Sequence, residues 1–152
     1  DTNTGTLSAM MSGKFEESLV KDIVPFIEQN FRAIPDANHR GIAGLSMGGY
    51  QTLKITFQYP EEFEYIGVMN MGLFRNVNRV ELIEQIRTLK DSNPRLYYIG
   101  CGKNDFLHQG LMELLALYDE LGFKYIYNET DGGHSWNNWR LYLSEIASLF
   151  FK

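Results

Sequence analysis

Short apolar runs alternate with longer segments of helical periodicity along most of the chain. Apolar residues recur at every third or fourth position in five segments, as in amphipathic helices: 15–32, 49–59, 80–89, 107–121 and 136–151. Four short apolar runs lie between them and are typical of buried strands: 42–44, 65–70, 96–100 and 124–128. Strands that alternate with helices predict a parallel sheet covered on both faces, so the expected fold class is α/β.

The two end segments carry the least regular patterns. Residues 1–14 are rich in Thr, Ser, Asn and Gly and are interpreted as a lead-in loop, which leaves residues 15–152 as the folded part. Pro25 lies inside the first predicted helix and is expected to kink or interrupt it. That helix is expected to pack its apolar face on the sheet, with Phe15, Leu19, Ile23, Phe26 and Ile27. The last helix is expected to direct four apolar side chains to one face, namely Trp139, Leu143, Ile146 and Phe150.

Composition and charge exclude several classes of protein. Of the 152 residues, 44% are hydrophobic and 22% are charged, which is typical of one globular domain. The net charge of −5, without a cluster of Lys or Arg, argues against nucleic acid as a partner. No run approaches the roughly 18 apolar residues of a membrane helix, so no membrane association is expected. The single cysteine, Cys101, excludes an internal disulfide framework and a Cys-based zinc site.

Residues 44–48 read GLSMG and match the pattern G-x-S-x-G, the nucleophile elbow. A serine hydroxyl is a poor nucleophile unless it is lifted out of the sheet toward a base, so it stands on a strained strand-to-helix turn. We expect Gly44 and Gly48 to let the backbone bend this sharply without side-chain clashes. The motif follows a predicted strand and precedes a predicted helix, which makes Ser46 the candidate nucleophile. The alternative is a glycine-rich turn with an idle serine.

A serine nucleophile needs a base, and the chain has three histidines. His39 precedes the strand that leads to Ser46, so it is expected at the opposite end of the sheet. His108 opens a helix and is interpreted as a solvated or capping residue, or as one at the rim of a cleft. His134 follows the last strand in a Gly-rich loop, at the same sheet edge as Ser46, where catalytic groups gather in open parallel sheets. His134 is therefore the candidate base.

The base needs a carboxylate to orient it, and two aspartates compete for that role. Asp105 follows the third predicted strand and lies at the same sheet edge as Ser46 and His134. Asp131 precedes His134 by three residues, but from the same loop it would hold the ring less rigidly. Asp105 is favoured because the order Ser, Asp, His is that of α/β-hydrolases. Asp119 and Glu129 are interpreted as solvated.

Three motifs in this order resemble carbohydrate esterase family 1, which holds feruloyl esterases and acetyl xylan esterases and is similar to esterase D and enterochelin esterase. They are GLSMGGYQTL at 44–53, GCGKND at 100–105 and GGHSWNNWR at 132–140. The resemblance spans about residues 15–151. It implies that Ser46 is the nucleophile, Asp105 the acid and His134 the base, and that the backbone N–H of Met47 is one donor of the oxyanion hole.

The resemblance also implies a reaction and a substrate class. The reaction is hydrolysis of feruloyl or acetyl esters, polysaccharide-linked as in xylan or small, through an acyl-enzyme and without metal or cofactor. Trp136 and Tyr50 are candidate contacts for the substrate. The other interpretation of the two tryptophans of the last helix, Trp136 and Trp139, is that they are core residues. The alternatives are an esterase for a siderophore ester or for S-formylglutathione, or an inactive remnant that serves as a binding module. Family members act outside the cytoplasm, so secretion or a periplasmic location is expected.

The resemblance covers only the C-terminal half of an α/β-hydrolase, with about four parallel strands and their flanking helices. The sequence begins with Asp1 rather than Met and shows no signal peptide, so a processed product or a piece of a longer protein is expected. The strand before Ser46 would normally pair with an upstream strand and is expected to present an open edge. We expect the missing N-terminal half, as another chain, or a second copy of this chain to cover that edge.

Overall fold

The computed structural model describes residues 12–73 and 77–152. The chain forms two compact units, residues 1–36 and 37–152. Of the expected lead-in over residues 1–14, residues 1–11 lie outside the described part, and a helix begins at Lys14. Among the described residues, no helix is long and apolar enough to span a membrane.

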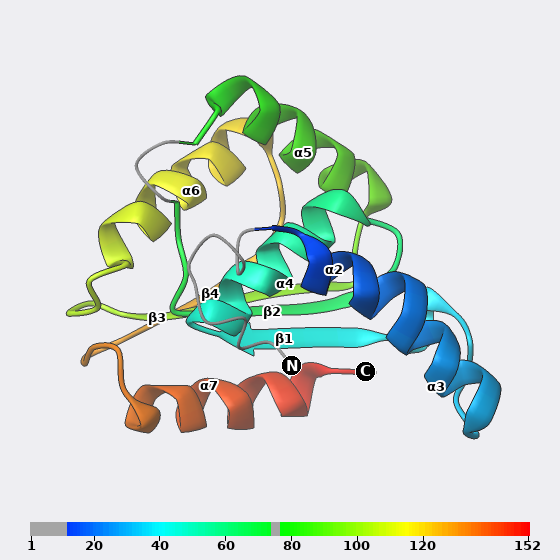
Figure 1. The fold of residues 1–152 in the computed structure, drawn as a ribbon. Coiled ribbons are helices and arrows are strands. Elements are labelled where there is room, and N and C mark those ends of the chain that lie inside the picture. The colour runs from blue at the N-terminus through cyan, green and yellow to red at the C-terminus, as the bar shows by residue number, and fades with distance from the viewer. Residues whose placement is uncertain (1–11, 74–76) are drawn as a thin grey trace. The chain divides into compact units, whose positions relative to one another are not determined.

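The first unit contains one interrupted helical segment (Figure 1). It consists of α2 (Lys14–Ser18), a π-helical stretch η1 (Leu19–Ile23) and α3 (Val24–Asn30). Pro25 lies in the first turn of α3, directly after the π-helical stretch, so the expected interruption is present. Proline has no N–H to donate back along the helix, and the wider π-helical turn absorbs that loss. Three apolar side chains of this segment are exposed, namely Ile23, Phe26 and Ile27, and its expected packing on the sheet stays a prediction.

The second unit is built on a sheet of four parallel strands that lie in chain order (Figure 1). They are β1 (Gly41–Leu45), β2 (Tyr65–Met69), β3 (Leu96–Gly102) and β4 (Ile126–Thr130). The central strands β2 and β3 are buried along their whole length, whereas β1 and β4 are only partly buried. Within the described residues β1 pairs with β2 alone, so the strand that leads to Ser46 has an open edge there, as expected.

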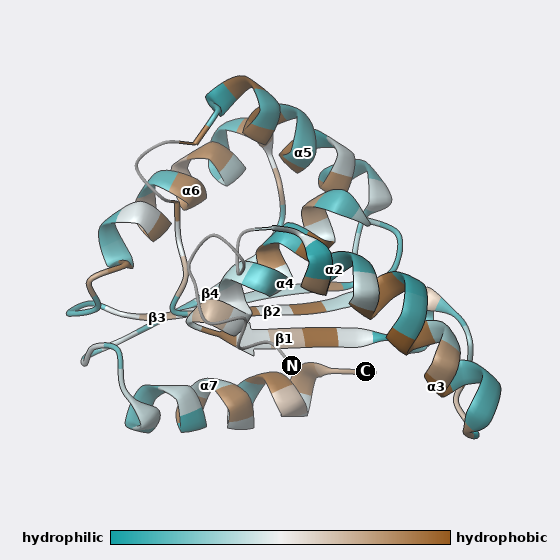
Figure 2. Cartoon of the chain, in the orientation of Figure 1, coloured by the Kyte–Doolittle hydropathy of each residue, from teal (hydrophilic) through white to brown (hydrophobic). Residues whose placement is uncertain are grey.

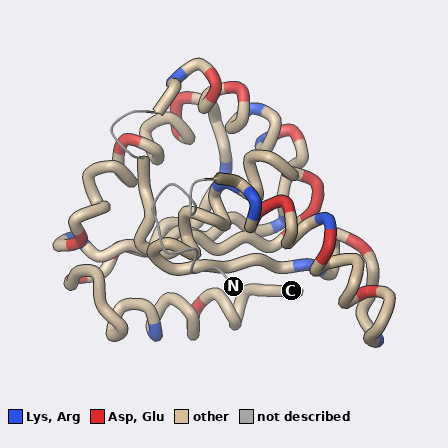
Figure 3. Tube along the Cα trace, in the orientation of Figure 1, with Lys and Arg blue, Asp and Glu red and all other residues tan. Residues whose placement is uncertain are grey.

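Helices cover both faces of this sheet, as predicted. Figure 1 shows α4, α5 and α6 on one face and α7 on the other. Their bounds are α4 (Met47–Gln58), α5 (Arg79–Ser92), α6 (His108–Leu121) and α7 (Trp136–Leu149), and a short 3-10 turn, η2 (Ala37–His39), precedes β1. Figure 2 shows hydrophobic positions along the strands and on parts of the helices, and Figure 3 shows basic and acidic residues interspersed along α5.

The buried face of α7 differs from the expected one. Asn138, Tyr142 and Ile146 are buried, whereas Leu143 is 57% exposed and Trp139 and Phe150 pack at the margin of the core. The cause lies in the opposing strand, where a Cβ on Gly100 would stand 2.6 Å from the Tyr142 ring. Glycine there admits a large ring, and the Tyr142 hydroxyl is bonded to Thr130 Oγ1 at 2.5 Å. A polar end that is hydrogen-bonded allows tyrosine to take a core position.

Candidate active site

Ser46 joins the end of β1 to the start of α4 in a strained backbone conformation. Its φ of 54° and ψ of −115° lie in a region that side chains other than glycine rarely adopt. Its N–H donates to the Met69 carbonyl at 2.9 Å, and its own carbonyl accepts from Tyr50 N–H at 3.0 Å. The backbone on both sides of Ser46 is therefore anchored, and the strained turn is held in place.

The two glycines of the motif contribute differently to this turn. A Cβ on Gly44 would stand 2.2 Å from the Gly48 carbonyl oxygen, so residue 44 has no room for a side chain. A Cβ on Gly48 would meet no atom within 4 Å outside its own helix. The expectation that both glycines relieve a side-chain clash is thus correct for Gly44 and wrong for Gly48. The turn brings the Gly48 carbonyl against residue 44, and only one of the two positions is crowded.

Three polar side chains meet at the carboxyl ends of β1, β3 and β4. His134 Nε2 lies 2.7 Å from Ser46 Oγ, and His134 Nδ1 lies 2.8 Å from Asp105 Oδ2. Because an ionised carboxylate only accepts, Nδ1 carries the proton, and Nε2 is left to accept from the serine hydroxyl. The structure thus brings together the three residues that the sequence singles out. His134 lies between the other two, with Ser46 at its Nε2 and Asp105 at its Nδ1.

Asp105, and not Asp131, is the carboxylate that contacts His134. Asp105 is 5% exposed, and its other carboxylate oxygen accepts the Leu107 N–H at 2.8 Å. Asp131 points away, with a side chain that is 99% exposed and lies 3.3 Å from Lys103 Nζ. The buried aspartate comes from a different loop than the histidine, so the ring is held from outside its own flexible segment.

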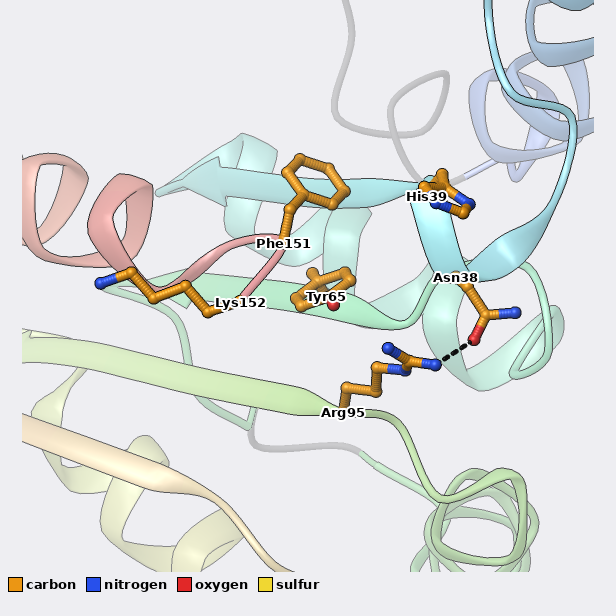
Figure 4. A pocket seen from close by; sticks show the side chains of 6 residues that line it. All are labelled: Asn38, His39, Tyr65, Arg95, Phe151 and Lys152. Carbon is orange, nitrogen blue, oxygen red and sulfur yellow. Dashed lines mark hydrogen bonds between the residues drawn. The ribbon is translucent and has the colours of Figure 1, made fainter.

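The other two histidines lie elsewhere. His108 begins α6 and bonds Glu129 at 2.8 Å, and this hydrogen bond holds the pKa of the exposed Glu129 carboxyl below its usual range. His39 lies in η2, at the amino ends of the strands, as expected. There it lines a pocket of about 400 Å³ together with Asn38, Tyr65, Arg95, Phe151 and Lys152 (Figure 4). Neither histidine joins the chain of contacts at Ser46.

Aromatic rings flank His134 on two sides. The ring of Trp139 lies 5.1 Å from the imidazole and that of Phe106 lies 4.7 Å from it. Trp136 packs edge-on against Trp139 at 4.9 Å and is 65% exposed, while Phe106 is 75% exposed. Sequence reasoning named Trp136 but not Phe106, whose only signal is its position directly after Asp105. The rings of Phe106 and Trp136 are thus both open to solvent.

Tyr50 and Met47 both lie in the first turn of α4. Tyr50 is half-buried, and its ring lies 5.7 Å from Lys54 Nζ. Met47 is the first residue of α4, where a backbone N–H has no partner within its own helix. That N–H stands next to Ser46 and is able to donate to an incoming group. Among the described residues, no group of three His, Cys, Asp or Glu side chains is arranged to hold a metal ion.

One residue at this edge was not foreseen. Asn70, directly after β2, is fully buried, has a positive φ of 50° and donates from Nδ2 to Asp105 Oδ2. The sequence offers a weak signal for it, since a polar residue interrupts an apolar run at the end of a strand. Its partner lies 35 residues further along the chain, and no local pattern reveals such a contact.

The chain is similar in sequence to known esterases. The Esterase family model matches residues 8–74, which is less than half of the chain and includes Ser46. The endo-1,4-beta-xylanase/feruloyl esterase of Xylanibacter ruminicola is 29% identical over 153 residues, which cover 100% of this chain and 20% of that protein. The acetyl esterase of Caldicellulosiruptor saccharolyticus is 25% identical over 171 residues, which cover 91% of this chain and 64% of that protein.

A solved structure shows the same fold. The CE1 ferulic acid esterase of Anaeromyces mucronatus superposes with a TM-score of 0.79 at 19% identity, over 90% of this chain and 53% of that one. The chain thus spans between a fifth and two thirds of the proteins it matches. It has part of an α/β-hydrolase fold, and the resemblance to feruloyl and acetyl esterases of carbohydrate esterase family 1 that its motifs predict is confirmed.

Proposed function

We propose that this chain carries the reacting groups of a serine carboxylic-ester hydrolase. The observation that supports this best is the unbroken line of contacts from the strained Ser46, through His134, to the buried Asp105, at 2.7 and 2.8 Å. A serine needs an adjacent base to become a nucleophile, and the base needs a partner that fixes its tautomer. Each of these requirements is met by one residue.

In the proposed reaction, His134 Nε2 takes the Ser46 proton while Oγ attacks the ester carbonyl carbon. The carbonyl oxygen becomes an oxyanion, and the Met47 N–H donates to it. The Ser46–ester tetrahedral intermediate collapses as His134 gives the proton to the leaving alcohol. Water, deprotonated by His134, then attacks the acyl carbon, and the acid is released as the bond to Ser46 Oγ breaks and Oγ takes the proton back from His134. Asp105 stabilises the imidazolium that forms in both steps and stays ionised.

For the substrate we propose feruloyl or acetyl esters of plant cell-wall polysaccharide such as xylan. The names of two relatives, a xylanase/feruloyl esterase and an acetyl esterase, support this class. The exposed ring of Phe106, against His134, and that of Trp136, against Trp139, favour an aromatic acyl group or a sugar ring in contact with them. Tyr50, one turn after Ser46, is a further candidate contact. Secretion, or a periplasmic location, follows from such a substrate, since the polysaccharide does not enter cells.

The open edge of β1 leads to a proposal about partners. We expect an N-terminal half, as further chain or a separate one, or a second copy of this chain to pair with β1, because an unpaired apolar edge promotes association. Sedimentation of the purified 152-residue chain tests this. A single monomeric species that unfolds cooperatively would show that the fold closes without a partner.

Labelling with a fluorophosphonate tests the proposed function. The reagent is expected to modify Ser46 in the wild type and not in Ser46→Ala, which also loses turnover of a p-nitrophenyl acyl ester. Ser135→Ala, which removes the serine next to His134, is the matched control and is expected to label normally. Labelling that persists in Ser46→Ala, or that fails in a folded wild type, would contradict the proposal and favour an inactive binding module. Parallel assays with methyl ferulate, an acetylated xylan and S-formylglutathione separate the substrate classes.

A further inference from the structure

Asn70 occupies an unusual position for a polar residue. It follows the buried strand β2, is fully buried and adopts a left-handed backbone with φ 50°. Its N–H donates to the Gly100 carbonyl at 2.7 Å, which ties this turn to the neighbouring strand β3. Asparagine tolerates a positive φ better than most residues, and residues held there cluster at functional sites. The turn directs the Asn70 side chain across to the loop after β3, where Asp105 lies.

The side chain of Asn70 completes the hydrogen bonds of the Asp105 carboxylate. Asn70 Nδ2 donates to Oδ2, the same oxygen that faces His134 Nδ1 at 2.8 Å. The other oxygen, Oδ1, accepts the Leu107 N–H at 2.8 Å. A carboxylate oxygen has two lone pairs, so Asn70 occupies one on Oδ2 and the second is left for the imidazole. Both oxygens are thereby fixed, and the carboxylate cannot rotate away from His134.

The other end of the same amide is unsatisfied. Among the described residues, the buried Asn70 Oδ1 accepts no hydrogen bond. Reversing the amide would place Oδ1 against the carboxylate and bring two acceptors together, so the bond to Asp105 sets the orientation. A buried acceptor without a partner costs free energy, and the contact with Asp105 is what this side chain gains in return.

We propose that Asn70 is a positioning residue that locks the Asp105 carboxylate in the rotamer required by His134. This inference rests on the proposed function only for its catalytic consequence, because the geometric claim concerns the contacts of Asp105 alone. Without Asn70, the carboxylate keeps only the Leu107 N–H as an anchor, and the bond from His134 loses its fixed acceptor. Catalysis then slows because His134 samples orientations in which Nε2 no longer faces Ser46.

Proton NMR of the full chain tests the inference without requiring activity. A histidine N–H that is bonded to a buried carboxylate gives a downfield signal in slow exchange with water, which His134→Gln assigns by its loss. The signal is expected in the wild type and lost in Asn70→Gly, a change that suits the positive φ. Asn93→Gly is the matched control, because Asn93 has φ 53° at the end of α5, and this variant is expected to keep the signal.

Steady-state kinetics give a second readout. Asn70→Gly is expected to lower kcat by about tenfold to a hundredfold with KM within about a factor of two, since the change acts on positioning and not on substrate contacts. If Asn70→Gly does not fold in plain buffer, both proteins are measured with trimethylamine N-oxide, an osmolyte that strengthens the burial of apolar groups. A downfield signal that persists in the folded variant would overturn the inference. If the wild type shows the signal but hydrolyses no ester, the proposed function fails while the role of Asn70 still stands or falls by NMR.

Discussion

The two ends of the sheet in residues 37–152 share four strands but differ in how their polar groups are connected. At the amino end, a pocket of about 400 Å³ opens between His39, Arg95 and Lys152, and Arg95 donates to Asn38 at 2.7 Å (Figure 4). At the carboxyl end, Ser46 and Asp105 are both bonded to His134. A pocket lined by charged side chains does not by itself organise a reaction. Partly buried polar groups that are hydrogen-bonded to one another have the organisation that a reaction requires.

Backbone conformation separates the two ends as well. Ser46 and Asn70 have positive φ values and follow β1 and β2 directly at their carboxyl ends. At the amino end the comparable residue is Phe151, with φ 62°, which packs its ring 4.8 Å from that of Tyr65. At the carboxyl end the strained residues direct polar side chains toward residues of other loops. At the amino end the strained residue, Phe151, packs an apolar ring against Tyr65.

The largest expected effect is the difference between removing the histidine at the carboxyl end and removing the one at the amino end. His134→Ala should lower kcat/KM for p-nitrophenyl acetate by about 10⁴-fold, because the serine loses its base. His39→Ala should leave kcat/KM within about a factor of two, since His39 lies at the amino end. The two variants are compared in one assay, with circular dichroism as a control for folding. Similar losses in both would remove the functional distinction between the two ends.

Much of this arrangement is foreseeable from the sequence. The four strands and the order of Ser46, Asp105 and His134 follow from periodicity and from the rule that carboxyl ends of parallel strands share one edge. The exposed side of α7 is not foreseeable, because Tyr142 displaces Leu143 from the core only where Gly100 leaves room for a ring. Contacts between distant segments decide such details, and periodicity within one helix does not contain them.

The residues that sequence reasoning missed share a similar cause. Asn70 acquires its role from a contact with Asp105, and nothing local marks it. Phe106 is an exposed apolar residue in a loop, and the hydropathy pattern assigns no role to such a residue. Gly48 shows the opposite error, because the motif assigns it a steric role that its open surroundings do not require. The motifs contain the three residues that contact one another at this edge, Ser46, Asp105 and His134, but they do not predict the contacts of the residues around them.

Cys101 provides the second test of this comparison, since it lies near the carboxyl end of β3, four residues before Asp105. Burial, with the nearby Asp105 charge, raises the pKa of its thiol to about 12. Only the thiolate reacts, so alkylation by iodoacetamide at pH 8 should be about 10³-fold slower in the folded chain than in urea. Mass spectrometry over time measures both rates. Fast alkylation under native conditions would show that this end of the sheet opens to solvent.

Glycine substitutions compare the packing of the two ends. Gly44→Ala should lower the free energy of unfolding by about 2–3 kcal/mol, because its Cβ would meet the Gly48 carbonyl at 2.2 Å and backbone cannot yield. Gly41→Ala, at the amino end, should cost less, since its Cβ would meet the Phe150 ring at 2.6 Å and a side chain can rotate. Gly48→Ala is the control within the motif and should raise stability by about 0.5 kcal/mol, as alanine favours the helix. Urea denaturation gives all three values, and equal losses at Gly44 and Gly48 would contradict this reading of the turn.

The smallest expected effect concerns the aromatic rings at the two ends. Phe106→Ala and Trp136→Ala should each lower kcat/KM for methyl ferulate by about threefold to tenfold, which is what one aromatic contact contributes. Methyl acetate has no ring to contact, so its hydrolysis should change by less than about a factor of two. Phe151→Ala removes a ring from the amino end and should alter neither substrate's kcat/KM. Equal slowing of methyl ferulate and methyl acetate in Trp136→Ala would show that this tryptophan supports the loop of His134 instead of contacting the acyl group.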